Sequence, residues 1–186
     1  MSLQLYIGPM FSGKSSAALE LINTFENNGA RLLCITSNLD KRYTNEAVIV
    51  SHDKVSHPAV AVSTLKELLE TEVFINADAI VIDESQFFPD LKDFVLTAVD
   101  VYGKDVACVG LDGDSNRKPF GQILDLIPYC DFVKKLKAKC SVCGLNDGIF
   151  THRIAVNVSE QIHVGGANTY MTLCRMHYLE KNWGYY

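Results

Sequence analysis

Residues 8–15 read Gly8-Pro9-Met10-Phe11-Ser12-Gly13-Lys14-Ser15 and match the pattern G-x-x-x-x-G-K-[ST]. The apolar run 3–7 precedes them, and apolar residues at helical spacing follow as far as Asn28-Gly29. The motif therefore lies between a predicted strand and a predicted helix, where backbone N–H groups and the helix N-terminus favour a bound phosphate. Lys14 would reach the β- and γ-phosphates of a nucleotide, and the Ser15 hydroxyl would ligate Mg²⁺. A chance glycine turn before a helix is the alternative, which this context disfavours.

The chain beyond this motif alternates short apolar runs with helical patterns. The patterns predict strands at 31–36, 79–82 and 105–111 and helices at 64–74 and 90–102. The strands lack polar alternation, which is typical of strands buried on both faces of a parallel sheet. The predicted fold class is therefore α/β, a P-loop NTPase-like parallel sheet with flanking helices. Residues 38–57 are polar and irregular, and we predict a surface loop there.

Two acids, Asp83 and Glu84, end the predicted strand at 79–82. A P-loop fold presents an acid at this position that helps hold Mg²⁺, and Asp83 fits that role. Glu84 follows directly and can point towards the crevice at the carboxyl ends of the strands, where a substrate hydroxyl would need a base. A pair of solvated acids at a strand end is the alternative, which the neighbouring phosphate motif disfavours.

Cysteine and histidine form two spaced pairs in the C-terminal part of the chain. Cys140 and Cys143 form C-x2-C, and Cys174 precedes His177 with the same spacing. Three thiolates and an imidazole complete a tetrahedral zinc set with no position open for water, so the site would be structural. Unrelated cysteines or a redox dithiol are the alternatives, but the second pair ends in His and the first lies outside a thioredoxin-like start.

The segment between the two pairs contains Gly165-Gly166 shortly before Tyr170. Glycines permit close approach of the backbone, and a tyrosine can close over a flat ring. A hairpin turn followed by a packed tyrosine is the commoner explanation of the same pattern.

Composition and charge exclude several classes of protein. The chain has 186 residues, 48% apolar and 21% charged, as an ordinary globular protein has. Lys and Arg number 17 against 22 Asp and Glu, and the net charge of -5 argues against non-specific binding of nucleic acid. Apolar runs fall short of the roughly 20 residues of a membrane span, and the basic start of a signal peptide is missing. We therefore expect a cytoplasmic protein that binds no membrane.

Taken together, the motifs resemble those of the zinc-bearing, cytosolic-type (type II) thymidine kinases over nearly the whole chain. The matching stretches are 8–15, 82–88, 110–113, 117–121, the two ligand pairs and 165–170. The resemblance implies transfer of the ATP γ-phosphate to the 5′-hydroxyl of thymidine in pyrimidine salvage, and leaves deoxyuridine open as a second acceptor. It implies Glu84 as the general base, with Asp83 acting through Mg²⁺.

The lysine-rich stretch 134–139 marks a change of character, because the βα pattern is lost after it. We therefore predict two domains, a P-loop α/β ATP-binding domain at 1–138 and a zinc-binding lasso domain at 139–186. The implied cofactor-binding residues are Gly8, Pro9, Met10, Phe11, Ser12, Gly13, Lys14, Ser15, Asp83 and Gln86. The implied substrate-binding residues are Met10, Phe87, Leu111, Ser115, Phe120, Thr151, Gln161, Ile162, His163, Val164, Gly165 and Tyr170. The implied zinc ligands are Cys140, Cys143, Cys174 and His177.

The resemblance further implies that the protein is a homotetramer inhibited by dTTP. It implies ATP, Mg²⁺ and structural Zn²⁺ as cofactors. Ser115 departs from the family, which usually has an aromatic residue facing the nucleoside at this position. The alternative function is a P-loop ATPase with a zinc ribbon that acts on nucleic acid. That alternative needs a basic face and further ATPase motifs, which the acidic balance and the short chain disfavour.

Overall fold

The computed structural model describes residues 1–39, 47–50, 55–154, 161–162 and 165–183. Its centre is a sheet with strand order β5-β2-β6-β7-β1-β8, in which every neighbouring pair is parallel. The strands are β1 (Ser2–Ile7), β2 (Leu32–Ser37), β5 (Val60–Val62), β6 (Ala79–Ile82), β7 (Asp105–Gly110) and β8 (Phe132–Lys135). The predicted α/β class with a parallel sheet is confirmed.

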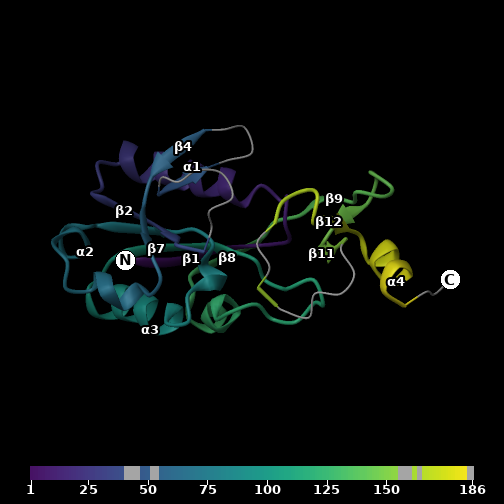
Figure 1. The fold of residues 1–186 in the computed structure, drawn as a ribbon. Coiled ribbons are helices and arrows are strands. Elements are labelled where there is room, and N and C mark those ends of the chain that lie inside the picture. Colours follow the sequence, from purple (N-terminus) through teal and green to yellow (C-terminus); the bar gives the residue numbers. More distant parts are fainter. Residues whose placement is uncertain (40–46, 51–54, 155–160, 163–164, 184–186) are drawn as a thin grey trace.

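Helices cover both faces of this sheet. The α-helices are α1 (Lys14–Asn27), α2 (Glu72–Asn76), α3 (Leu91–Leu96) and α4 (Arg175–Trp183). Shorter helical turns are the 3-10 segments Leu65–Leu68, Ser85–Phe87 and Ile123–Tyr129 and the π-helical Thr97–Val101. Helix α1 lies on one face, and α2 and α3 lie on the other (Figure 1).

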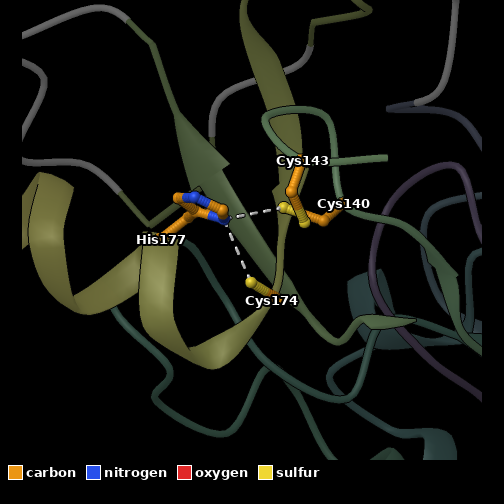
Figure 2. A group of neighbouring side chains, drawn as sticks. All are labelled: Cys140, Cys143, Cys174 and His177. Carbon is orange, nitrogen blue, oxygen red and sulfur yellow. Dashed lines mark hydrogen bonds between the residues drawn. The ribbon is translucent and has the colours of Figure 1, made fainter. Parts of the chain in front are cut away.

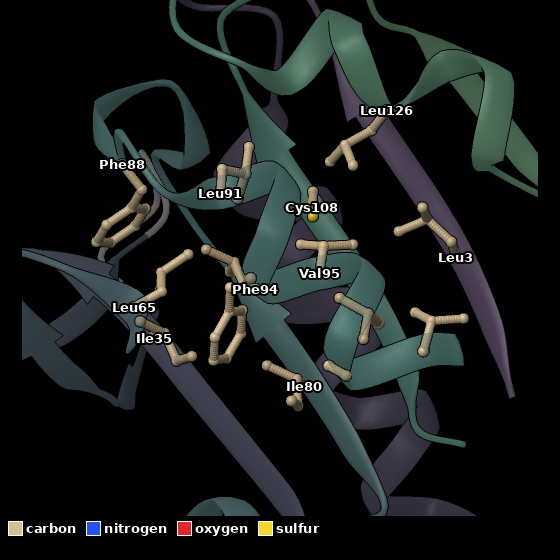
Figure 3. Close-up of a cluster of buried hydrophobic side chains, with 14 of the residues drawn as sticks. Leu3, Ile35, Leu65, Ile80, Phe88, Leu91, Phe94, Val95, Cys108 and Leu126 are labelled. Atoms are coloured by element: carbon tan, nitrogen blue, oxygen red, sulfur yellow. The ribbon is translucent and has the colours of Figure 1, made fainter. Parts of the chain in front are cut away.

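The core consists of two apolar layers, because successive side chains of a strand point to opposite faces. In β6, Ile80 and Ile82 join the layer beneath α2 and α3, whereas Val81 joins the layer beneath α1. Figure 3 shows the larger layer, in which Phe94 of α3 packs over the sheet. The Phe94 ring centroid lies 5.5 Å from that of Phe74 in α2, so the two helices share one aromatic contact.

The C-terminal lobe lies beyond the carboxyl ends of the sheet strands (Figure 1). It contains the antiparallel pairs β9–β10 and β11–β12 and helix α4. Its strands are β9 (Ala138–Lys139), β10 (Asp147–Gly148), β11 (Phe150–Arg153) and β12 (Tyr170–Leu173). The domain boundary near residue 138 stays a prediction.

Two predicted helices are less regular than their patterns suggested. The segment 64–74 divides, because the Thr71 side chain accepts a hydrogen bond from the Phe74 amide and begins α2 there. The segment 90–102 changes from α to π geometry at Thr97, whose hydroxyl donates to the Asp93 carbonyl, a bond that disturbs a regular helix.

The predicted loop at 38–57 contains a hairpin, so that part of the prediction was wrong. Strands β3 (Val48–Val50) and β4 (Ser56–Pro58) pair antiparallel, and Ile49 is buried against α1. Residues 40–46 and 51–54 of this loop lie outside the described residues. The edge strand β8 was not predicted either, because its lysines give it the polar composition typical of a linker.

Helices long and apolar enough to cross a membrane are absent from the described ranges.

Candidate active site

The phosphate loop begins where β1 ends. Gly8 is required there because a Cβ atom would lie 2.6 Å from the Leu136 carbonyl oxygen. Gly13 has a φ of 79° in the left-handed region, and α1 begins immediately after it. Lys14 donates from its ammonium group to the Pro9 carbonyl at 2.7 Å, so the loop curls around its own lysine.

The two acids follow β6 on the same edge of the sheet. Ile82 pairs with Cys108, and Ile7 pairs with Gly110, so β6, β7 and β1 end side by side. Asp83 is 6% exposed, and its Oδ1 accepts the Glu84 amide at 2.9 Å. The neighbouring carboxylates therefore lie at the crevice that parallel sheets use for ligands.

Glu84 has a left-handed backbone, with φ 50°, which is costly for a residue with a side chain. A buried amide stabilises its carboxylate: Gln86 Nε2 donates to Glu84 Oε2 at 2.5 Å. The same amide accepts the Leu111 N–H on Oε1 at 2.9 Å, so Gln86 links the ends of β6 and β7. Gly110 leaves room for this link, because a Cβ there would lie 2.6 Å from Gln86 Oε1.

A pocket of about 440 Å³, part of it open to solvent, lies between these strand ends and the C-terminal lobe. On the side of the sheet, the pocket is lined by Met10, Glu84, Phe87, Leu111, Gly113, Asp114, Ser115 and Phe120. From the C-terminal lobe it is lined by Thr151, Arg153, Gln161, Gly165 and Tyr170. The Phe87 and Phe120 rings meet edge to face with centroids 5.6 Å apart, which gives the pocket one apolar wall.

The loop after β7 is attached to the C-terminal lobe by an aromatic cluster. The Arg117 guanidinium lies over the rings of Phe150, Tyr178 and Trp183, at 5.3, 4.8 and 4.8 Å from their centroids. The Tyr178 hydroxyl donates to the Ser115 carbonyl at 2.7 Å. Helix α4 therefore holds the loop that carries Ser115 against the pocket.

Asp114 joins this loop to the lobe through its buried carboxylate. Its Oδ1 accepts the amides of Asn116 and Lys118 at 2.8 and 2.9 Å, which stabilises the turn. Its Oδ2 accepts Gln161 Nε2 at 3.0 Å, and Gln161 also donates to the Pro119 carbonyl at 3.2 Å. One wall of the pocket is thus formed by two segments distant in sequence.

Cys140, Cys143, Cys174 and His177 form a cluster that could hold a metal ion. Their ligand atoms all lie within 4.8 Å of one another (Figure 2). His177 Nδ1 lies 3.2 Å from the Cys174 sulfur and 3.5 Å from the Cys140 sulfur. Its Nε2 lies 3.9 Å from a Glu180 carboxylate oxygen, so the outer side of the ring faces an acid, as in many metal-bound histidines.

The ionisation of the Cys140 thiol favours a bound cation. Burial opposes ionisation of Cys140, but hydrogen bonds from the Cys143, Cys174 and Val142 backbone and from His177 outweigh it and lower the pKa to about 6. Burial raises the pKa of Cys174, and contact with Cys140 raises it further. A cation would relieve the repulsion between neighbouring thiolates.

The predicted site residues are distributed as follows. Those that line the pocket are Met10, Glu84, Phe87, Leu111, Ser115, Phe120, Thr151, Gln161, Gly165 and Tyr170. Ile162 is 44% exposed and is not among the lining residues, and His163 and Val164 lie outside the described part of the chain. Gln86, predicted to bind the nucleotide, bonds to Glu84 and Leu111, and its nucleotide contact stays a prediction.

Sequence reasoning missed three lining residues, Gly113, Asp114 and Arg153. Arg153 follows Thr151 by two positions on β11, and residues at this spacing lie on one face of a strand. That periodicity could have identified it. Arg153 pairs across the hairpin with Tyr170, and its Nη2 donates to the Tyr170 hydroxyl at 3.2 Å.

A sequence profile of the thymidine kinases matches residues 1–178. The chain belongs to the thymidine kinase family. A thymidine kinase of rice (Oryza sativa subsp. japonica) is 41% identical over 96% of this chain and 66% of its own length. A thymidine kinase of Yaba monkey tumor virus is 38% identical over 97% of this chain and 96% of its own. The human protein "Thymidine kinase, cytosolic" is 34% identical over 96% of this chain and 74% of its own.

The family membership accounts for the arrangement of the pocket. In this thymidine kinase family member, Met10 of the phosphate loop and Glu84 of the acid pair line one pocket with residues of the lobe that carries the Cys/His cluster. The predicted resemblance to the thymidine kinases is therefore confirmed.

Proposed function

We propose that this protein is a thymidine kinase that transfers the γ-phosphate of ATP to the 5′-hydroxyl of thymidine to give dTMP, in pyrimidine salvage. The observation that carries the proposal is the shared pocket: Met10 of the phosphate loop and Glu84 line one cavity in a chain of this family. Deoxyuridine is the natural second acceptor to test, because it differs from thymidine only in the base methyl group.

The residues present fit ATP and Mg²⁺. The left-handed Gly13 leads directly into α1, so the loop's backbone amides gather at a helix N-terminus, where an anion is favoured. These amides and Lys14 would hold the phosphates. The hard oxygen ligands of Ser15 and Asp83 suit Mg²⁺, which neutralises charge on phosphate oxygens when bound.

Glu84 would accept the proton of the acceptor hydroxyl. The Gln86 amide holds one oxygen of its carboxylate, which fixes the orientation in which the other can act. Met10, Phe87 and Phe120 would contact the base, and Thr151 and Tyr170 would close the pocket from the lobe. Catalysis would then rest on positioning and charge, as phosphoryl transfer requires.

We assign structural Zn²⁺ to the Cys/His cluster. Three sulfur donors and one imidazole nitrogen are the donor set of closed zinc sites, and they do not suit Mg²⁺. The ion would join β9 and β12 to α4, which orders the lobe that closes the pocket. Elemental analysis of protein purified without chelator should find one zinc per chain.

Cytoplasmic location, a homotetramer and inhibition by dTTP are further proposals, supported by the family resemblance and by the human relative's name. Gel filtration with light scattering measures the assembly, and a dTTP titration measures the inhibition.

The test of the proposed function is a panel of nucleosides with MgATP. We expect thymidine to be phosphorylated faster than deoxycytidine or the purine nucleosides. Single-stranded DNA belongs in the same panel as an activator of ATP hydrolysis. Stimulation by DNA without nucleoside phosphorylation would establish the alternative ATPase, which the net charge of -5 does not favour.

Ser115→Phe tests the departure from the family. The residue lines the pocket, and an added aromatic ring should contribute about 0.5–1.5 kcal/mol beyond area burial, or roughly a 2- to 12-fold lower thymidine KM. We expect kcat to stay nearly constant, because the phosphate loop and both acids are unchanged. Steady-state kinetics measures both constants. An unchanged KM in folded protein would mean that Phe120 already covers the base.

A further inference from the structure

Two buried threonines of the C-terminal lobe bind the backbone N–H and C=O of one residue of the phosphate loop. Thr151 in β11 and Thr172 in β12 pair directly across the hairpin, and they are 5% and 1% exposed. Thr151 Oγ1 accepts the Met10 amide at 3.0 Å, and Thr172 Oγ1 donates to the Met10 carbonyl at 2.7 Å. We call Thr151, Thr172 and the backbone of Met10 the threonine clamp.

The clamp acts on a segment without regular secondary structure. Phe11, the next residue, has a left-handed φ of 62°, which a residue with a side chain adopts only when its surroundings hold it. Met10 itself is buried, so its carbonyl would lose its partner inside the protein if the Thr172 hydroxyl were removed. The clamp is therefore a strong constraint on the path of the phosphate loop.

The other end of the clamp adjoins the metal cluster. The Thr172 carbonyl accepts the Ser141 amide at 2.8 Å, and the Thr172 amide donates to Ser141 Oγ at 3.3 Å. Ser141 follows Cys140, and Cys174 lies two positions beyond Thr172. Hydrogen bonds and backbone thus connect the cluster continuously to Met10.

We propose that Thr172 is a positioning residue for phosphoryl transfer. Its hydroxyl fixes the position of the Met10 backbone and, through it, the path of the phosphate loop. The proposal rests on the proposed kinase function. Met10 also lines the pocket with Glu84, so the residue that the threonines hold belongs both to the phosphate loop and to the pocket wall. Thr172 is not among the residues that line the pocket, and we expect its effect to pass through the loop.

The test compares Thr172→Val with Thr172→Ser. Valine keeps the shape and removes the hydroxyl, whereas serine keeps the hydroxyl. For Thr172→Val we expect about a tenfold higher ATP dissociation constant, as loss of a partner for a buried carbonyl implies. We expect kcat to fall about 10- to 100-fold through misplacement of the loop. The thymidine KM should change less than about threefold, since most pocket walls are untouched, and serine should restore both ATP affinity and kcat.

Thr71→Val is the matched control. The Thr71 hydroxyl also donates to one backbone carbonyl, that of Leu68, and accepts one amide, that of Phe74, but it lies at the start of α2 outside the pocket. Loss of the Thr71 hydroxyl should lower the midpoint temperature of thermal unfolding and leave ATP affinity unchanged. If Thr172→Val is insoluble, Thr172→Ala removes the same hydroxyl with less crowding.

Three results would overturn the proposal. The first is an ATP dissociation constant within twofold of wild type in folded Thr172→Val or Thr172→Ala. The second is failure of Thr172→Ser to keep the wild-type ATP affinity, and the third is an equal loss of ATP affinity in Thr71→Val. The ATP measurement separates this proposal from the kinase function. If the wild type binds ATP but does not phosphorylate thymidine, the kinase assignment fails, and the variants' ATP affinities still test the clamp.

Discussion

Glu84→Gln should lose phosphoryl transfer by about 10²- to 10⁴-fold while ATP still binds, because a positioned base contributes that much. The amide of the variant keeps an oxygen that can accept from Gln86 Nε2, so the local geometry should persist while the proton acceptor is lost. Measured kcat with thymidine and the ATP dissociation constant give the two readouts.

Glu70→Gln is the control for this variant, because it removes the same charge from an exposed position away from the pocket. Its kcat should match that of the wild type. A kcat of Glu84→Gln within about threefold of wild type would remove Glu84 from the role of base.

Cys174→Ser should lose the zinc that we propose for the Cys/His cluster, and with it the ordered lobe. Structural zinc contributes on the order of 10 kcal/mol to the folding of small domains, more than the lobe's small apolar cluster can replace. We expect at least about a tenfold rise in thymidine KM. The ATP dissociation constant should rise as well, by about as much as in Thr172→Val, because the disordered lobe also loses the threonine clamp on Met10. Elemental analysis and steady-state kinetics measure these effects.

The single tryptophan, Trp183 in α4, reports on the lobe directly, because it stacks on Arg117. Its fluorescence should shift in Cys174→Ser. The control is Cys130→Ser, which changes a cysteine outside the cluster and should retain metal, fluorescence and activity. Retention of metal and thymidine KM by Cys174→Ser would contradict the structural assignment of the cluster.

The sequence predicted the features that depend on local chemistry. The phosphate loop is a contiguous motif, and the four cluster residues are recognisable from their ligand type and spacing. The buried strands β2, β6 and β7 stand out because they are continuously apolar. These elements need little information from distant parts of the chain.

The features that were missed depend on contacts between distant segments. Asp114 was missed, and its bond to Gln161 has no sequence signature. Gln86 was predicted as a nucleotide ligand, but its bonds to Glu84 and Leu111 were not predicted. Strand β8 becomes a strand only by pairing with β1, since its own residues are exposed and partly charged. Tertiary pairing overrides local composition at such positions.

The threonine clamp has a consequence for how the protein is synthesised. Its two hydrogen bonds join residues 141 and 162 positions apart. A ribosome makes the phosphate loop first and the residues that fix it long afterwards, and domains generally fold in the order of synthesis. In the nascent chain, the phosphate loop therefore lacks its hydrogen bonds to Thr151 and Thr172 until β12 has emerged from the ribosome. Polypeptides released before that point should be unable to bind ATP tightly.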